Sequence, residues 1–182
     1  MRGVRVDGAS CVHSVAGLVM IESLGPFTTA AKDLPSSLAA SIAKRSHRPA
    51  RIHQSLEDAA VANSQGMLRV PLPASRIMVR RGVKKKDDGY IWRADPKLRA
   101  RSRLPMTEEI VESFLKAVKC PTLVVTAHDG LRLVQGDELI RQRLGLMEKA
   151  KHIELESGGH HIHITEAESV VAPTKSFLRS LL

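Results

Sequence analysis

The stretch that decides the fold covers residues 119–165, which opens K-C-P-T-L-V-V-T-A-H-D-G at 119–130 and closes H-I-E-L-E-S-G-G-H-H-I-H-I-T at 152–165. Residues 122–126 are apolar or β-branched, which is typical of a strand that a sheet buries on both faces. Residues 152–156 alternate apolar and polar side chains, which predicts a second strand. Since a helical segment separates the two, we expect a parallel β-α-β unit.

Both predicted strands end in a polar turn. The first is followed by A-H-D-G at 127–130, and the second by S-G-G at 157–159, which leads directly to His160. In α/β proteins the carboxyl ends of parallel strands are where reactive side chains gather. An acid at one strand end and a histidine at the next form the orienting half of a nucleophile–histidine–acid triad.

Four stretches of the sequence carry a resemblance to a known family. They are L-V-M-I-E-S-L-G-P at 18–26, Y-I-W-R-A-D-P-K-L-R at 90–99, C-P-T-L-V-V-T-A-H-D-G at 120–130 and G-G-H-H-I-H-I at 158–164. In this order they resemble the C-terminal half of an α/β-hydrolase, most closely the serine hydrolase-like proteins of that superfamily. The resemblance implies a partial α/β-hydrolase fold, with parallel strands at 18–22, 122–127 and 152–156 equivalent to the last three of the sheet, and an inserted helical cap.

On this basis the chain divides into four parts. We expect an irregular N-terminal segment at 1–16, a first core strand within 17–26, a helical cap insertion at 27–105 and the C-terminal part of the α/β-hydrolase core at 106–182. The G-P pair that closes the second part breaks the chain direction before the insertion.

The resemblance implies a serine nucleophile on a G-x-S-x-G elbow, and the sequence has no such motif. The nearest string, G-A-S-C-V at 8–12, lacks the final glycine, and its Ser10 lies too close to Gly17 for an elbow helix to fit between them. We therefore interpret Ser10 as a chance match. The chain is expected to be truncated, or to need a complementing N-terminal half.

For the other two members of a triad the sequence offers candidates. The resemblance implies that His160 is the general base, with one ring nitrogen toward the nucleophile and the other toward an acid. Two acids stay open: Asp129, one place before the commonest acid position at Gly130, and Glu22, which ends the first strand, where some related hydrolases carry the acid. We favour Asp129 and keep Glu22 as the alternative.

The histidines around His160 raise the question of a metal site. Zinc requires three or four ligands that converge on one point, whereas H-H-I-H at 160–163 spans a turn that points its rings in different directions. We therefore interpret His161 and His163 as packing or surface neighbours, and expect neither a metal nor a cofactor.

The charge and the cysteine content of the chain indicate its cellular compartment and the kind of partner it could bind. The 182 residues carry 28 Lys and Arg against 19 Asp and Glu, a formal net charge of +9 that favours anionic partners by long-range attraction. Much of this charge lies at 80–103, which we interpret as a solvated cap edge; nucleic-acid binding is not expected, because no nucleic-acid fold signature accompanies it. Cys11 and Cys120, far apart and without a C-x-x-C pair, are typical of a reduced, cytoplasmic protein, and no apolar run is long enough for a membrane span.

The function that follows from the resemblance is hydrolysis of an ester-like or similar small molecule through an acyl-enzyme. The alternative is a non-catalytic interaction module, or truncated pseudoenzyme, that binds anionic partners through the basic cap edge. Because the strand at 18–22 would lack its usual neighbour, its open edge also predicts pairing with a second copy of the chain or with a complementing N-terminal half.

Overall fold

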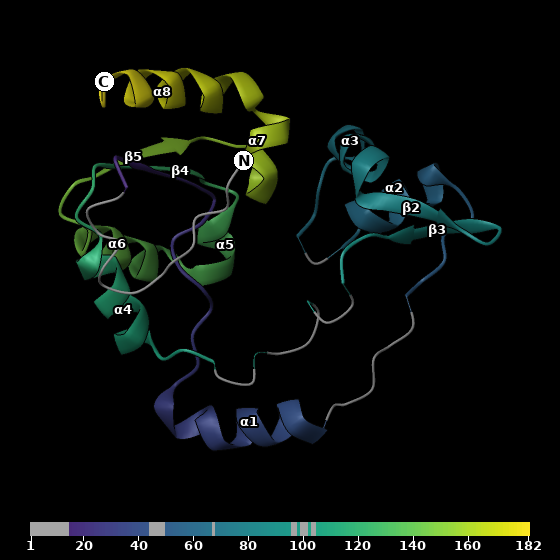
Figure 1. The fold of residues 1–182 in the computed structure, drawn as a ribbon, viewed down its shortest axis with the longest axis horizontal. Coiled ribbons are helices and arrows are strands. Elements are labelled where there is room, and N and C mark those ends of the chain that lie inside the picture. Colours follow the sequence, from purple (N-terminus) through teal and green to yellow (C-terminus); the bar gives the residue numbers. More distant parts are fainter. Residues whose placement is uncertain (1–14, 44–49, 67, 96–97, 99–101, 103–104) are drawn as a thin grey trace. The chain divides into compact units, whose positions relative to one another are not determined.

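The protein is described by a computed structural model that covers residues 15–43, 50–66, 68–95, 98, 102 and 105–182. The chain forms two compact units, shown in Figure 1. The first contains the chain up to Phe27 together with Glu108–Leu182, and the second consists of Thr28–Thr107. The second unit is therefore an insertion within the first.

The first unit is built on a three-stranded parallel sheet with the order β1-β4-β5. The strands are β1 (Leu18–Ile21), β4 (Thr122–Ala127) and β5 (Ala150–Leu155). All six residues of β4 are buried, as the apolar, β-branched sequence of this strand predicts. The β4 and β5 strands pair in parallel, which confirms the predicted β-α-β unit.

Helices cover both faces of this sheet (Figure 1). On one side lie α4 (Glu108–Ala117), α5 (Leu131–Gln135) and α6 (Asp137–Gly145). On the other side, η3 (Gly159–His161) leads into α7 (Ile162–Thr165) and α8 (Ala167–Arg179). Successive β4 side chains serve the two faces: Val124 packs in the core under α4, while Val125 packs with Ile162 and Val170 of α7 and α8. The result is a three-layer α/β/α arrangement.

The two outer strands of the sheet differ in character. On β5, Lys151, His152 and Glu154 place polar or charged groups along the strand, which is how natural edge strands resist further pairing. By contrast β1 is L-V-M-I throughout, and all four of its residues are only partly buried. Its sequence is that of an interior parallel strand, although among the described residues it lies at the edge.

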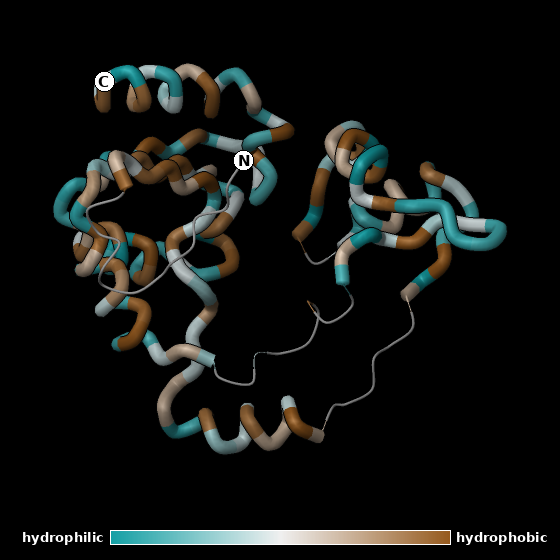
Figure 2. The backbone as a smooth tube through the Cα atoms, in the orientation of Figure 1, coloured by the Kyte–Doolittle hydropathy of each residue, from teal (hydrophilic) through white to brown (hydrophobic). Residues whose placement is uncertain are grey.

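The second unit contains helices and an antiparallel hairpin. Its elements are η1 (Ala31–Asp33), α1 (Leu34–Ala43), α2 (Leu56–Ser64), α3 (Leu72–Gly82), β2 (Val83–Lys86) and β3 (Gly89–Trp92). A small core of Ala59, Ala60, Val79 and Val83 joins α2, α3 and β2. Within the predicted helical insertion, the basic stretch forms a regular antiparallel hairpin, in which Val83 and Ile91 bury their side chains while the lysines of β2 face solvent. Figure 2 shows the polar tip of this hairpin in teal.

A fully buried arginine holds the chain where the insertion leaves the first unit and returns to it. Arg143 on α6 makes a two-pronged contact with the Glu108 carboxylate, with Nε–Oε1 and Nη2–Oε2 distances of 2.8 and 2.7 Å. It also donates to the carbonyls of Leu24 at 2.9 Å and Pro26 at 3.1 Å. Because Leu24 and Pro26 lie just before the insertion and Glu108 lies just after it, the Arg143 side chain fixes the chain on both sides of the insertion.

Candidate active site

Glu22 follows β1, and both its backbone conformation and its carboxylate are fixed by the surrounding structure. It has a φ of 47°, unusual for a residue other than glycine, and its side chain is buried. Oε1 accepts a hydrogen bond from the Ala127 amide at 2.5 Å, and Oε2 accepts one from the Leu131 amide at 2.6 Å. Two backbone donors from the turn after β4 therefore hold this carboxylate in one orientation.

Gly130 leaves the space that the Glu22 carboxylate occupies. A Cβ atom at position 130 would lie 2.3 Å from Oε2 of Glu22, well inside van der Waals contact. Position 130 is the commonest acid position implied by the sequence resemblance. In this chain that position cannot carry any side chain while Glu22 stays in place, so the two acid positions exclude one another.

His160 lies in η3, after β5, and faces Glu22. Its Nδ1 atom is 3.4 Å from Oε2 of Glu22, and 31% of its side chain is exposed. Nδ1 itself is buried and makes no hydrogen bond to any described residue. The Nδ1 atom is directed toward the carboxylate, at a distance slightly longer than an ordinary hydrogen bond.

Asp129 contacts the backbone of the histidine segment and not the His160 ring. Its Oδ1 atom accepts a hydrogen bond from the Gly159 amide at 2.9 Å, in the turn that delivers His160. Among the described residues, no ion pair joins Asp129 to His160, whereas one joins Glu22 to His160. The structure thus brings both predicted acids to the histidine segment, Glu22 at the ring and Asp129 at the backbone, and this geometry favours Glu22 as the partner of the ring.

The neighbouring histidines stack along the same segment. The rings of His160 and His161 are 5.2 Å apart, and those of His161 and His163 are 5.7 Å apart, both edge to face. Burial, and then the charges of the two neighbouring rings, lower the pKa of His161. In the part of the chain that the structure describes, no three His, Cys, Asp or Glu side chains are placed to hold a metal ion.

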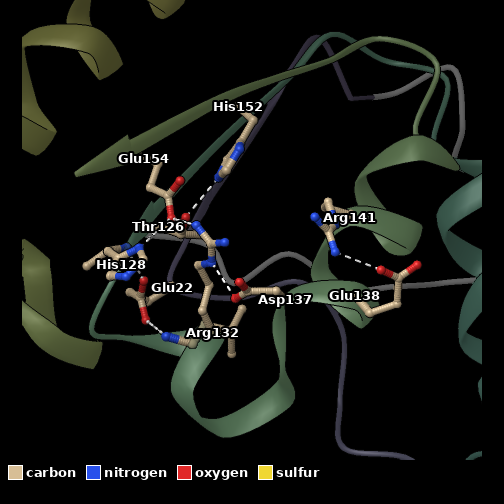
Figure 3. Close-up of polar contacts among 11 residues, drawn as sticks. Glu22, Thr126, His128, Arg132, Asp137, Glu138, Arg141, His152 and Glu154 are labelled. Carbon is tan, nitrogen blue, oxygen red and sulfur yellow. Dashed lines mark hydrogen bonds and ion pairs between the residues drawn. The ribbon is translucent and has the colours of Figure 1, made fainter. Parts of the chain in front are cut away.

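A polar network lies beside the site on β4, β5 and α5 (Figure 3). Arg132 hydrogen-bonds to Asp137 at 2.7 Å and also to Glu154. Their mutual hydrogen bond is the main reason that the pKa of Arg132 is raised and that of Asp137 lowered. His152 lies 2.8 Å from the Thr126 hydroxyl, and burial lowers its pKa. A shallow groove of about 360 Å³ is lined by His128, Glu154, Leu155 and Glu156.

Sequence reasoning missed the parts of the site that the backbone supplies. The amides of Ala127 and Leu131, and the gap at Gly130, have no signature in a single sequence. The glycine that ends the A-H-D-G turn at 127–130 was visible in the sequence. The reason for a glycine there, a carboxylate that follows a strand far away in the chain, was not visible. Ser10 lies outside the described residues, as do the basic residues Lys97, Arg99, Arg101 and Arg103.

Comparison with known proteins points to one fold. No protein-family model and no curated protein matches the chain. Among solved structures it is similar to the hypothetical protein PA1622 from Pseudomonas aeruginosa PAO1, with 26% identity, a TM-score of 0.78, and coverage of 90% of this chain and 58% of that one.

Two further similar structures are of proteins with a named activity. A thioesterase domain from the curacin biosynthetic pathway is 21% identical, with a TM-score of 0.65 and coverage of 91% of this chain. A thermophilic esterase from Thermogutta terrifontis is 15% identical, with a TM-score of 0.61 and coverage of 94%. The chain spans 58% of the length of each. No helix in the described residues is long and apolar enough to cross a membrane. With its parallel sheet, its helices on both faces and these neighbours, the chain has a partial α/β-hydrolase fold.

Proposed function

We propose that this chain contributes the histidine and the acid of a hydrolase triad, with His160 as general base and Glu22 as the acid that orients it. The observation that supports this most is the 3.4 Å approach of His160 Nδ1 to Glu22 Oε2 at the carboxyl end of the parallel sheet. A carboxylate held by two backbone amides would fix the ring tautomer and stabilise the imidazolium formed during proton transfer.

The proposed reaction is hydrolysis of a small ester or thioester. In such a reaction the base takes the proton of the attacking hydroxyl and later returns a proton to the leaving group. Esterases and a thioesterase among the structural neighbours support this reaction class. The serine and the oxyanion donors would come from outside the described residues, and the second unit would act as the cap.

The proposal also names a partner for the open sheet edge. The apolar sequence and partial burial of β1 support pairing with a second copy of the chain or with a complementing N-terminal half. Such pairing would continue the sheet beyond β1 and would place further polypeptide next to Glu22. A cytoplasmic location stays a prediction from the two separate cysteines.

Labelling with a fluorophosphonate probe tests the catalytic proposal. A labelled serine should appear when the folded full chain is assayed with the proteins that co-purify with it, and the chain alone should stay unlabelled, because its sequence has no G-x-S-x-G elbow. The His160→Ala variant should label slower by several orders of magnitude, since loss of the base in a serine protease costs about 10⁶-fold. His163→Ala, in the same segment, is the control and should label normally. Absence of labelling in the mixture with the co-purifying proteins, with the chain folded by circular dichroism, would contradict hydrolysis through this pair.

A second candidate function rests on the basic surface of the insertion. Arg80, Arg81 and the three lysines of β2 are exposed and form no ion pair with any described residue. This supports binding to anionic partners by a non-catalytic module. A salt-dependent pull-down on anionic resin that weakens when the lysines at 84–86 are changed to alanine would support this function; binding that is unchanged would exclude it.

A further inference from the structure

The turn after β4 holds both members of the histidine–acid pair. Ala127 and Leu131, at its two ends, donate to the Glu22 carboxylate. Between them, His128 donates its amide to the carbonyl of Leu155 at 2.8 Å, which fixes the end of β5. Asp129 then accepts from the Gly159 amide at 2.9 Å. Two consecutive residues of one turn therefore hold the segment 155–159 at both ends.

The two glycines before His160 make this segment of the backbone intrinsically flexible. Gly158 and Gly159 have φ angles of 128° and 66°, a region in which glycine is free and other residues are strained. Consecutive glycines lose more conformational freedom on ordering than any other pair, so a specific contact is needed to fix them. The Asp129 carboxylate makes one such contact by accepting a hydrogen bond from the Gly159 amide. The Thr165 hydroxyl makes another by donating to the Gly158 carbonyl at 2.7 Å.

We propose that Asp129 is a positioning residue that acts as a hydrogen-bond acceptor for Gly159 and thereby sets His160 against Glu22. This inference rests on the proposed function of the pair and adds a role for the second acid. The ion pair of the His160 ring is with Glu22 and, among the described residues, none joins the ring to Asp129, so we assign the acid of the triad to Glu22 and the backbone contact to Asp129. The role needs an oxygen that accepts a hydrogen bond, and it does not need a negative charge.

The experiment uses nuclear magnetic resonance of the full-length, ¹⁵N-labelled chain, with two readouts. The first is the His160 Nδ1–H resonance, identified by its absence in His160→Ala and its change in Glu22→Asp. The second is hydrogen exchange at the Gly159 amide. In Asp129→Ala, Gly159 should exchange about five to thirty times faster, the factor for one lost interaction, and the Nδ1–H resonance should broaden or move. Asp88→Ala, in the exposed hairpin turn, is the control and should change neither.

Asp129→Asn separates the two roles that Asp129 could have. Its side-chain oxygen still accepts from Gly159, so both readouts should stay close to wild type. The inference is overturned if Asp129→Ala leaves both readouts unchanged with the chain folded, or if Asp129→Asn behaves like Asp129→Ala, since the charge would then be what matters. If the wild-type chain shows no Nδ1–H resonance that depends on Glu22, the proposed pair fails, while Gly159 exchange still tests the role of Asp129.

Discussion

At the scale of single residues, Glu22 shows how a strained backbone and a precise set of contacts occur together. Its φ of 47° costs free energy that the surrounding contacts must offset. In those contacts the carboxylate accepts hydrogen bonds from the amides of Ala127 and Leu131, and the backbone amide of Glu22 donates a hydrogen bond to the Val125 carbonyl at 2.8 Å. Strained residues of this kind cluster at functional sites, and the His160 ring next to Glu22 fits that pattern.

The space at Gly130 gives the first prediction. Gly130→Ala should destabilise the fold by about 1–3 kcal/mol, because the new Cβ would displace a carboxylate that two amides hold in place. Chemical denaturation measures the change. Gly145→Ala is the matched control, since no atom lies within 4 Å of its added Cβ; this helical variant should be as stable as wild type or up to about 1 kcal/mol more stable. Equal effects of the two changes would contradict this account.

The buried arginine gives the second prediction. Arg143→Met should cost about 3 kcal/mol or more, because it removes the buried hydrogen bonds that Arg143 donates to the Glu108 carboxylate and to the Leu24 and Pro26 carbonyls. Arg141→Met removes an exposed ion pair with Glu138 on the same helix and should change stability by less than about 0.5 kcal/mol. Thermal and urea unfolding of both variants would check the difference. A stability of Arg143→Met equal to that of wild type would show that the contact contributes nothing.

At the scale of elements, the β4–β5 pair should make stability depend on pH. Burial lowers the pKa of His152 on β5, so the unfolded chain takes up a proton at a higher pH than the folded one. Stability is then fully present above the unfolded pKa of about 6.5 and falls as the pH drops below it. The lowered pKa of His161 acts in the same direction.

The third prediction follows from this sign. The melting temperature should fall between about pH 7.5 and about pH 5.5, and His152→Gln should reduce that fall, because one of the two contributing rings is removed. A slope identical in wild type and His152→Gln would rule out a contribution from this histidine.

At the scale of the whole molecule, the position of β1 at the edge of the sheet, as seen among the described residues, gives an expectation for the state of the chain in solution. Leu18 and Glu22 donate their amides to the neighbouring segment of β4, at Pro121 and Val125. In a parallel ladder every second residue directs its amide to the opposite side, so Val19 and Ile21 present hydrogen-bonding groups at the outer edge. Apolar side chains on both faces of this short strand add to the tendency to pair.

The fourth prediction concerns that edge. Light scattering coupled to size-exclusion chromatography should show the purified chain as a dimer or larger assembly whose mass rises with concentration. Val19→Pro should shift it toward monomer, because proline removes an outward amide and leaves the bonds to β4 intact. Asp88→Lys, in the second unit, is the control and should associate like wild type. A concentration-independent monomer in the wild-type chain would contradict pairing through β1.

The sequence by itself determined the parallel strands and the segment that carries His160. A buried strand is encoded locally, by the apolar, β-branched side chains of 122–127, so one sequence was enough to predict β4 within a residue. The glycines before His160 likewise marked the turn. The β5 strand starts at Ala150, earlier than the predicted start at 152, because Ala150 and Lys151 are extended by pairing with β4 and not by a local alternation of apolar and polar side chains.

Only the tertiary structure decided which acid faces the histidine. Asp129 is near His160 in the pattern of strand ends, but its carboxylate is used by the Gly159 amide. Glu22 reaches the ring because the β1–β4 register, which pairs Ile21 with Val125, brings it to the amides of Ala127 and Leu131. Strand propensity depends on neighbouring residues, whereas the contacts of a carboxylate depend on backbone groups that are distant in the chain, and only folding brings these together.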